Sequence, residues 1–534
     1  MPTSLCHVLV LAVLSISLSA SAALADVMRE LPVVDLIPVG DQLDANPRLY
    51  GQNTDIMDWH GAIVTQQPPF FIDPKTGKPD PVWEPLTHAF PFRQMRLNTL
   101  NKYLWKDGIG PVAERKSIKH DVYNLYYRTE AGLDEYLRWL ETLPGKPEAT
   151  LVASPLLPVE YAADLVAYCN ATKGPMARLR AANGHPKPYN VMIWEMGNEA
   201  DGELRGDLGA LRPDTEEERK QRMRAADYLA LVEPRIKAMR AVDPRIRIFV
   251  HTATPPWFFD NPTWFEWHRE VLKKLGSRID GVVIHLYYDG YSVPTCLRSL
   301  DKLIADVTEL SPPDKKLTVW VNEHARWMSQ DHWEQTWSLQ GAISTGDWLI
   351  ELIKRPKVEA ANYWCYGHRG PWRVIDAGPG IRYGTAIFEL YRVLNEVTLS
   401  KAQPLKVADH HDLADLSKGY SYAVNCVEFV DPKTGRLSLF AINRSPEQSF
   451  TLRFKLGSKE SMQVRRMCVT GAALDATNVP ETPSAVTTSE TLLVVTPDAD
   501  GNAKLELPAR SVTGWVISQI GKRADKGSHD QGPL

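Results

Sequence analysis

The sequence predicts an α/β fold, a (β/α)8 TIM barrel followed by a C-terminal all-β sandwich domain. From residue 46 to 400, short β-rich runs alternate with longer helical patterns, and eight such units can be distinguished. Several runs are continuously apolar, which is typical of parallel strands covered on both faces. From 401 to 520 strand-like runs continue without helical patterns. The length of 534 residues fits two units, because a single core stops growing at about 250–300 residues.

Each predicted barrel strand is a short run rich in aliphatic and aromatic residues. These runs are 47–53, 92–100, 149–155, 190–198, 246–253, 281–288, 317–323 and 360–367. Residues 129–143 follow the second run and residues 213–242 the fourth, and both segments have helical patterns. The charge run within the longer of them is more typical of a solvated helix face than of a ligand site.

The β domain is predicted from strand-like runs separated by turn residues. Residues 420–430 and 436–445 flank a DPKTG turn and form a predicted hairpin. The further runs are 450–456, 491–497, 503–508 and 511–520. An N-terminal segment, 26–45, is expected to add a strand to this sandwich. The polar tail, 521–534, is expected to be disordered.

The N-terminus has the features of a cleaved export signal. An apolar stretch at residues 8–18 is followed by small residues and by an Ala-Leu-Ala pattern at 23–25. The stretch is shorter than the about 20 residues that a membrane-spanning helix needs. Residues 1–25 are therefore predicted to be a signal peptide, and the mature protein is expected to be secreted or periplasmic.

Composition and motifs argue against several classes of partner. A net charge of −4 gives no reason to expect nucleic acid or an anionic membrane. No metal or cofactor is expected, because the sequence has no HExxH motif and Glu323-His324 lacks the second histidine of such a site. Five cysteines follow the signal without metal-ligand spacing, and they are predicted to be mostly buried thiols.

Two glutamates at the ends of apolar runs are the predicted catalytic residues. Glu199 follows the fourth run and Glu323 ends the seventh, so a closed barrel would bring both to its C-terminal face. There, one carboxyl group can protonate the leaving oxygen of a glycosidic bond while the other attacks the anomeric carbon or activates water. Glu199 must carry a proton for the first role, whereas Glu323 must stay ionised, which requires hydrogen-bond donors and a cation nearby. A carboxyl separation of about 5–5.5 Å would indicate retention, and about 6.5–9.5 Å inversion.

Motifs around these glutamates resemble those of a known family. Gly197-Asn198-Glu199 is similar to the acid/base motif of clan A retaining glycoside hydrolases. The stretch from Arg96 to WKDGIGP at 105–111 resembles a segment of glycoside hydrolase family 51, the α-L-arabinofuranosidase family. The first run and the HLYY of the sixth are similar to that family's strands. The resemblance covers most of the chain and implies a retaining enzyme that hydrolyses O-glycosidic bonds in plant or algal polysaccharides or oligosaccharides.

The resemblance also implies roles for individual residues, with Glu199 as acid/base and Glu323 as nucleophile. The implied substrate-binding residues are Asn198, Arg96, Asn101, Tyr287, His285, Trp327 and Asp55. Asn198 would hold the 2-hydroxyl of the sugar, and Arg96 and Tyr287 would keep the nucleophile ionised and oriented. A structural ion pair for Arg96, a core position for His285 and simple packing for Trp327 are the alternatives.

The chain departs from the family pattern at three places. Residues 98–100 are Asn-Thr-Leu where the family has a Pro-Gly-Gly turn, Asp55 stands where it has a glutamate, and His324 where it has a tryptophan. Two other functions therefore stay open: cleavage of a different β-glycan on the same fold, and carbohydrate binding by a barrel without activity. The resemblance also leaves a homo-oligomer open, because family members are often oligomeric.

Overall fold

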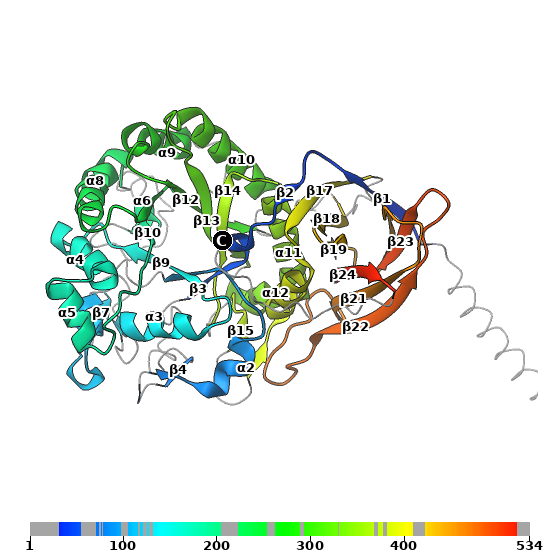
Figure 1. Cartoon of the computed structure of the whole chain (residues 1–534), viewed down its shortest axis with the longest axis horizontal. Helices are drawn as coiled ribbons and strands as arrows, with labels where there is room; N and C mark the ends of the chain where they lie inside the picture. The colour runs from blue at the N-terminus through cyan, green and yellow to red at the C-terminus, as the bar shows by residue number, and fades with distance from the viewer. Residues whose placement is uncertain are drawn as a thin grey trace, which may run out of the picture.

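The computed structural model describes fifteen stretches of the chain. They are residues 31–54, 71–73, 76, 78–97, 105–115, 118–120, 125–127, 132–203, 223–253, 262–288, 293–328, 330–367, 372–376, 382–408 and 422–520. The predicted signal peptide, the polar tail, Asp55, Asn101 and residues 98–100 lie outside the described residues. In Figure 1 the described stretches form a barrel with surrounding helices and, beside it, a domain of β-strands.

Eight parallel strands form the closed barrel that the sequence predicts. Along the chain they are β3 (Gly51–Thr54), β6 (Gln94–Leu97), β9 (Glu148–Ala153), β10 (Ile193–Met196), β11 (Arg247–His251), β12 (Gly281–Tyr288), β13 (Thr318–Arg326) and β14 (Val358–Tyr363). Each pairs in parallel with the next, and β14 closes the barrel by pairing with β3. The prediction of a (β/α)8 barrel is therefore confirmed.

The helices cover the outside of the barrel (Figure 1). They are α2 (Glu84–Thr87), α3 (Leu133–Thr142), α4 (Val159–Asn170), α5 (Pro175–Ala182), α6 (Ala200–Glu203), α8 (Ala225–Val242), α9 (Pro262–Leu275), α10 (Val293–Leu310), α11 (Leu339–Ile353) and α12 (Ala386–Val397). Short two- and three-residue strands lie in the loops: β4 (Ile72–Asp73), β5 (Lys78–Pro79), β7 (Ile118–His120), β8 (Leu125–Tyr127), β15 (Ile375–Asp376) and β16 (Tyr383–Gly384).

The first barrel strand is shorter than the sequence predicts. Residues Pro47–Tyr50 form a 3-10 helix, and the strand begins only at Gly51. The side chain of Asn46 accepts a hydrogen bond from the backbone N–H of Arg48, and Pro47 occupies the first helical position. A capping asparagine followed by proline is a helix start signal, which the prediction of a strand over 47–53 overlooked.

The interior of the barrel is built in layers because strand side chains alternate between its two faces. One layer is a cluster of buried apolar side chains, made by Ile193, Phe249, Val283, Trp320 and Ala360. Two residues further along the same five strands, the inward positions are polar: Glu195, His251, His285, Asn322 and Asn362, all buried. An apolar layer below and a polar layer above thus place charged groups at the C-terminal ends of the strands.

The second unit is an all-β domain, as predicted. Its strands are β1 (Val33–Pro38), β2 (Leu43–Asp44), β17 (Lys401–Val407), β18 (Val424–Asp431), β19 (Arg436–Asn443), β20 (Phe450–Lys455), β21 (Met462–Gly471), β22 (Val486–Val495), β23 (Asn502–Leu507) and β24 (Ser511–Gln519). From the N-terminal segment, β1 pairs antiparallel with β17 and parallel with β20. The sequence prediction missed β21, whose alternation is interrupted by two neighbouring arginines.

Helices α11 and α12 pack against the β domain (Figure 1). The contact is close at Gly514 of β24, where a Cβ atom would lie 2.7 Å from methyl carbons of both Val393 and Val397. A buried polar group joins the two units as well, because Asp347 of α11 accepts hydrogen bonds from Asn425 and Tyr422 of the β domain. Shared burial of this kind fixes the β domain on one side of the barrel.

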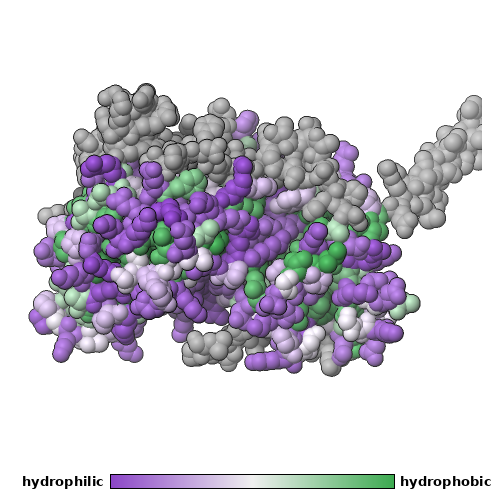
Figure 2. All heavy atoms as spheres, turned by 90° about the horizontal axis from the view of Figure 1, so that it is seen from above, coloured by the Kyte–Doolittle hydropathy of each residue, from purple (hydrophilic) through white to green (hydrophobic). Residues whose placement is uncertain are grey.

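Among the described residues, hydrophilic ones predominate on the face that Figure 2 presents, with hydrophobic ones between them. None of the helices in the described stretches has the length and apolar character needed to cross a membrane. The five cysteines at Cys169, Cys296, Cys365, Cys426 and Cys468 are free thiols, and all are buried, as the sequence predicts.

Candidate active site

An irregularity in strand pairing turns Glu323 toward the barrel interior. Ile284 of β12 is opposite Val321, but His285 is opposite Glu323, so Asn322 is an extra residue on β13. A bulge of this kind lets two consecutive side chains face the same side. Asn322 and Glu323 therefore both contribute to the polar layer, whereas strict alternation would have directed Glu323 outward.

Glu199 lies in the turn that follows the fourth strand. Gly197 has a φ of 83° and Glu199 a φ of 38°, both in the left-handed region that non-glycine residues rarely adopt. Strained backbone of this kind persists only where the surroundings hold it, and it occurs often at functional sites. The side chain of Glu199 is 28% exposed, whereas that of Glu323 is 7% exposed. Glu199 is thus the carboxyl group of the two that is more open to solvent.

Arg96, fully buried on β6, connects the two regions. Its Nη1 donates to Oε1 of Glu323 at 2.7 Å, and its Nη2 donates to Oδ1 of Asn198 at 2.7 Å. Nη1 also donates to Oδ1 of Asn53 at 3.1 Å. Because Arg96 binds the carbonyl oxygen of Asn198, it orients the amide NH2 group of that side chain. The predicted neighbourhood of Arg96, Asn198 and Glu323 is present in the structure.

Both carboxylate oxygens of Glu323 accept a hydrogen bond. Arg96 binds Oε1, and the hydroxyl of Tyr287 donates to Oε2 at 2.9 Å. Burial raises the pKa of Glu323, and the charge and hydrogen bond of Arg96 oppose this rise. Burial and the nearby carboxylate raise the pKa of Tyr287 well above its ordinary value, so its hydroxyl remains a donor. Two fixed donors define the orientation of the Glu323 carboxylate.

His285 lies between the two predicted catalytic glutamates. Its Nδ1 is 3.1 Å from Oε1 of Glu199 and 3.5 Å from Oε2 of Glu323. One oxygen atom of each glutamate lies within 4.8 Å of one of the other, a proximity that is compatible with the carboxyl separation of retaining enzymes. Burial lowers the pKa of His285 to about 3, so the neutral ring adds no charge beside the carboxylates.

Aromatic rings lie next to this group. Trp327 contacts the ring of Tyr287 with centroids 5.7 Å apart, and Trp372 contacts Trp327 at 5.4 Å. Trp372 is held by a hydrogen bond from its Nε1 to the backbone oxygen of Arg326. Trp327 is thus placed beside Tyr287, the residue whose hydroxyl donates to Glu323. The indole ring offers the apolar surface on which sugar faces stack.

His324 does not belong to this group, although it directly follows Glu323 in the sequence. Its ring faces outward, where Nδ1 is 3.2 Å from the hydroxyl of Tyr288 and the ring lies 6.3 Å from Trp348 of α11. Burial lowers the pKa of His324 to about 3. The departure from the family pattern at this position therefore concerns packing behind the strand.

Sequence reasoning missed four polar residues of the site. They are Asn53, Glu195, His251 and Asn322, all buried in the same layer. Glu195 accepts hydrogen bonds from Arg96, and His251 and Asn322 also contact it. The sequence did contain an indication for Glu195. It lies two residues after Ile193 on the same strand, so its side chain is expected on the same inward face, just before the turn that carries Glu199.

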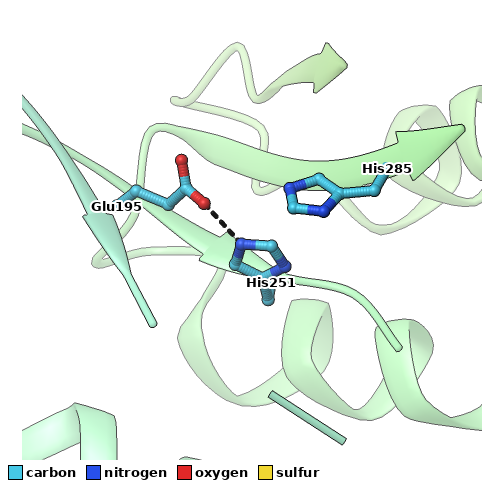
Figure 3. Close-up of side chains that lie close together, drawn as sticks. All are labelled: Glu195, His251 and His285. Atoms are coloured by element: carbon cyan, nitrogen blue, oxygen red, sulfur yellow. Dashed lines mark hydrogen bonds and ion pairs between the residues drawn. The ribbon is translucent and has the colours of Figure 1, made fainter. Parts of the chain in front are cut away.

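Two of these residues, with His285, offer atoms that could ligate a metal ion. Ligand atoms of Glu195, His251 and His285 lie within 4.8 Å of one another (Figure 3). Figure 3 shows His251 hydrogen-bonded to Glu195, with the ring of His285 close to that of His251. The donor types fit a transition metal, yet both oxygens of Glu195 already accept hydrogen bonds.

A closed parallel barrel with two glutamates at its C-terminal face, one held by an arginine and a tyrosine, is an arrangement found in (β/α)8 glycoside hydrolases. More particularly, the chain is similar to proteins of glycoside hydrolase family 51. Residues 95–207 match the family model described as "Alpha-L-arabinofuranosidase 1 domain". This region includes Arg96, Asn198 and Glu199.

Curated relatives agree with this resemblance. The chain is 28% identical over 284 residues to intracellular exo-α-(1→5)-L-arabinofuranosidase 1 of Bacillus subtilis, a match that covers 48% of this chain and about half, 53%, of that protein. It is 25% identical over 399 residues to exo-α-(1→6)-L-arabinofuranosidase of Bifidobacterium longum, covering 67% of this chain and 72% of the relative.

Solved structures with the same fold come from more than one family. A family 51 α-L-arabinofuranosidase from Bifidobacterium longum has a TM-score of 0.74 at 20% identity, covering 91% of this chain and 100% of that one. The arabinofuranosidase of Thermotoga maritima, solved with arabinose, has 0.73 at 18%, covering 92% and 100%. A family 44 xyloglucanase from Paenibacillus polymyxa still reaches 0.55 at 10%, covering 91% and 99%. At these identities the likeness shows the fold alone.

Proposed function

We propose that this chain is a retaining glycoside hydrolase that removes α-L-arabinofuranosyl groups from plant or algal polysaccharides or oligosaccharides. The proposal is carried by one observation: Glu199 and Glu323 offer oxygen atoms within 4.8 Å of each other at the C-terminal face of the barrel. The names of the relatives, two exo-acting arabinofuranosidases, support the choice of sugar and the exo mode.

The reaction proceeds by double displacement. Glu323 attacks the anomeric carbon, and the bond to the leaving oxygen breaks as Glu199 gives that oxygen its proton. A glycosyl-enzyme ester results. Glu199, now ionised, takes a proton from water, which attacks the same carbon and releases Glu323. Arg96 and Tyr287 hold the carboxylate of Glu323 in place for both steps.

Product analysis tests this function. We expect the full chain to release 4-nitrophenol from 4-nitrophenyl α-L-arabinofuranoside faster than from the corresponding β-D-xyloside and β-D-glucoside. It should also release arabinose from arabinan. Proton NMR during the first minutes should show the α-anomer of the released sugar. A β-anomer as first product would contradict retention, and faster cleavage of xyloglucan or a β-glucoside would favour the β-glycan alternative.

The remaining alternative is carbohydrate binding without catalysis. A pure binding site has no need for a carboxyl pair with separate hydrogen-bond partners, so the contacts of Glu199 and Glu323 favour an enzyme. Calorimetry with arabino-oligosaccharides separates the two functions. Saturable binding with no released sugar after prolonged incubation would support the binding module instead.

We also propose that residues 1–25 direct export of the chain, supported by the apolar stretch and the Ala-Leu-Ala pattern. The Bacillus relative is named as an intracellular enzyme, so location is a point on which the two proteins would differ. Expression of the full chain in a bacterium should yield periplasmic or extracellular protein whose N-terminus, by mass spectrometry, begins at Asp26. Full-length protein confined to the cytoplasm would refute the export proposal.

A further inference from the structure

Glu195 is a second buried carboxylate beside the predicted nucleophile. It lies on β10, four residues before Glu199, and its side chain has no exposed surface. Its Oε1 accepts from Nη2 of Arg96 at 2.6 Å and from Nε2 of His251, and its Oε2 accepts from Nε of Arg96 at 2.7 Å and from Asn322. These hydrogen bonds fix the position of the side chain. They also stabilise a negative charge that is buried away from water.

The contacts divide the guanidinium of Arg96 between two carboxylates. Glu195 binds the edge formed by Nε and Nη2 in a two-point pair, which fixes the plane of the guanidinium. The remaining Nη1 then points at Glu323. Without the two-point pair, the plane of the guanidinium would depend on its single hydrogen bonds to Asn53, Asn198 and Glu323.

We propose that Glu195 is a positioning residue, which orients Arg96 and takes up part of its positive charge, so that Arg96 aligns Glu323 without weakening it as a nucleophile. This inference rests on the proposed retaining mechanism, in which Glu323 must act first as nucleophile and then as leaving group. A carboxylate whose negative charge is fully compensated by a buried cation is a poor nucleophile toward the anomeric carbon. Glu195 takes up part of the positive charge of Arg96, so the charge of Glu323 is compensated only in part.

The charges around Glu323 are consistent with this role. Burial by itself would raise the pKa of Glu195, but the charges of Arg96 and His251 lower it below the usual range, so Glu195 stays ionised. The other groups that face the nucleophile are Glu199, His285 and Tyr287. Of these His285 is neutral at ordinary pH, because burial lowers its pKa to about 3. Arg96 is therefore the cation in direct contact with both buried carboxylates.

Replacing Glu195 by glutamine tests the proposal, because the amide keeps the size of the side chain, removes the charge and leaves one oxygen that can accept from Arg96. Loss of a neighbouring negative charge lowers the pKa of Glu323, so the acidic limb of the pH profile of kcat/KM should move to lower pH in Glu195→Gln. We expect kcat/KM on an aryl α-L-arabinofuranoside to fall by roughly 10²-fold. With a 2,4-dinitrophenyl leaving group, for which release of Glu323 limits the rate, kcat should fall much less.

Control variants separate charge from geometry and from folding. Glu195→Asp keeps the charge but shortens the reach, so it should lose activity while its acidic limb stays at the native pH. Glu460→Gln, at an exposed position of the β domain, should behave as native. Circular dichroism and the thermal unfolding midpoint show whether each variant is folded. If Glu195→Gln does not fold, native activity in Glu195→Asp would still refute the positioning role.

Three results would overturn the proposal. An acidic limb of Glu195→Gln that stays or rises would mean that Glu195 is only structural. Native activity in that variant would remove any role. Loss of native activity on dialysis against EDTA, restored by one divalent metal ion, would instead assign Glu195, His251 and His285 to a metal site. These results concern the role of Glu195 alone, and the proposed function stands as long as the unsubstituted protein cleaves the arabinofuranoside. If the unsubstituted protein has no glycosidase activity, the proposed function itself is refuted.

Discussion

Glu323→Ala is expected to lose turnover of aryl α-L-arabinofuranosides by on the order of 10⁴-fold or more, because the group that forms the covalent bond is gone. The fold should survive, since alanine leaves Arg96 paired with Glu195 through two hydrogen bonds. Circular dichroism of the variant checks this point. The measurement is kcat/KM at the pH optimum of the native chain, compared with Glu447→Ala at an exposed site of the β domain.

An external nucleophile should restore part of this activity. Alanine leaves a space where the carboxylate stood, so azide can reach the anomeric carbon from the side of Glu323 while Glu199 still protonates the leaving oxygen. A single displacement inverts the configuration, and NMR should therefore show the β-L-arabinofuranosyl azide. Glu447→Ala should give no such product. Undiminished hydrolysis by Glu323→Ala without azide would show that Glu323 is not the nucleophile.

The large features of the fold follow from patterns that a sequence displays directly. Continuously apolar runs such as the one at 281–288 are typical of parallel strands covered on both faces, and their number predicts the barrel. The same patterns place Glu199 and Glu323 at strand ends. The family resemblance predicted that Arg96 and Tyr287 lie beside Glu323. In the structure both donate a hydrogen bond to its carboxylate.

The contacts between strands that give the site its electrostatics could not be predicted in this way. Glu195 occupies the third position of a strand that otherwise consists of apolar residues, where a carboxylate is stable only because Arg96 and His251 reach it from other strands. Such pairing depends on barrel closure, which brings together residues far apart in the sequence. The bulge at Asn322 is a second example. The apolar residues of β13 still indicate a strand, but the register shift changes which of the following side chains face inward.

The local strain at Glu199 was equally hidden. A glutamate with a φ of 38° is unfavourable by itself, and no residue pattern around it announces the conformation. Its position depends on the turn at Gly197 and on the contact with His285. The result is a carboxyl group with partial exposure beside a buried one, so the two glutamates have different surroundings.

Glu199→Ala should produce a loss of activity that depends on the leaving group. Substrates with poor leaving groups, such as arabino-oligosaccharides, need a proton on the departing oxygen, and their kcat/KM should fall by about 10²–10⁴-fold. A 2,4-dinitrophenyl arabinofuranoside leaves without that proton, so its glycosyl-enzyme should still form. Because the variant lacks the base for the second step, a burst of dinitrophenol followed by slow turnover is expected, and the alkaline limb of the pH profile should disappear.

Azide distinguishes this variant from the loss of the nucleophile. In Glu199→Ala the glycosyl-enzyme is intact, and azide entering through the space left by the acid attacks the carbon opposite to Glu323. Two inversions give net retention, so the product should be the α-L-arabinofuranosyl azide, the opposite anomer to that from Glu323→Ala. The two glutamates are thereby assigned by stereochemistry rather than by rate alone. The same anomer from both variants, or an equal loss for all leaving groups, would mean that the roles given to Glu199 and Glu323 are wrong.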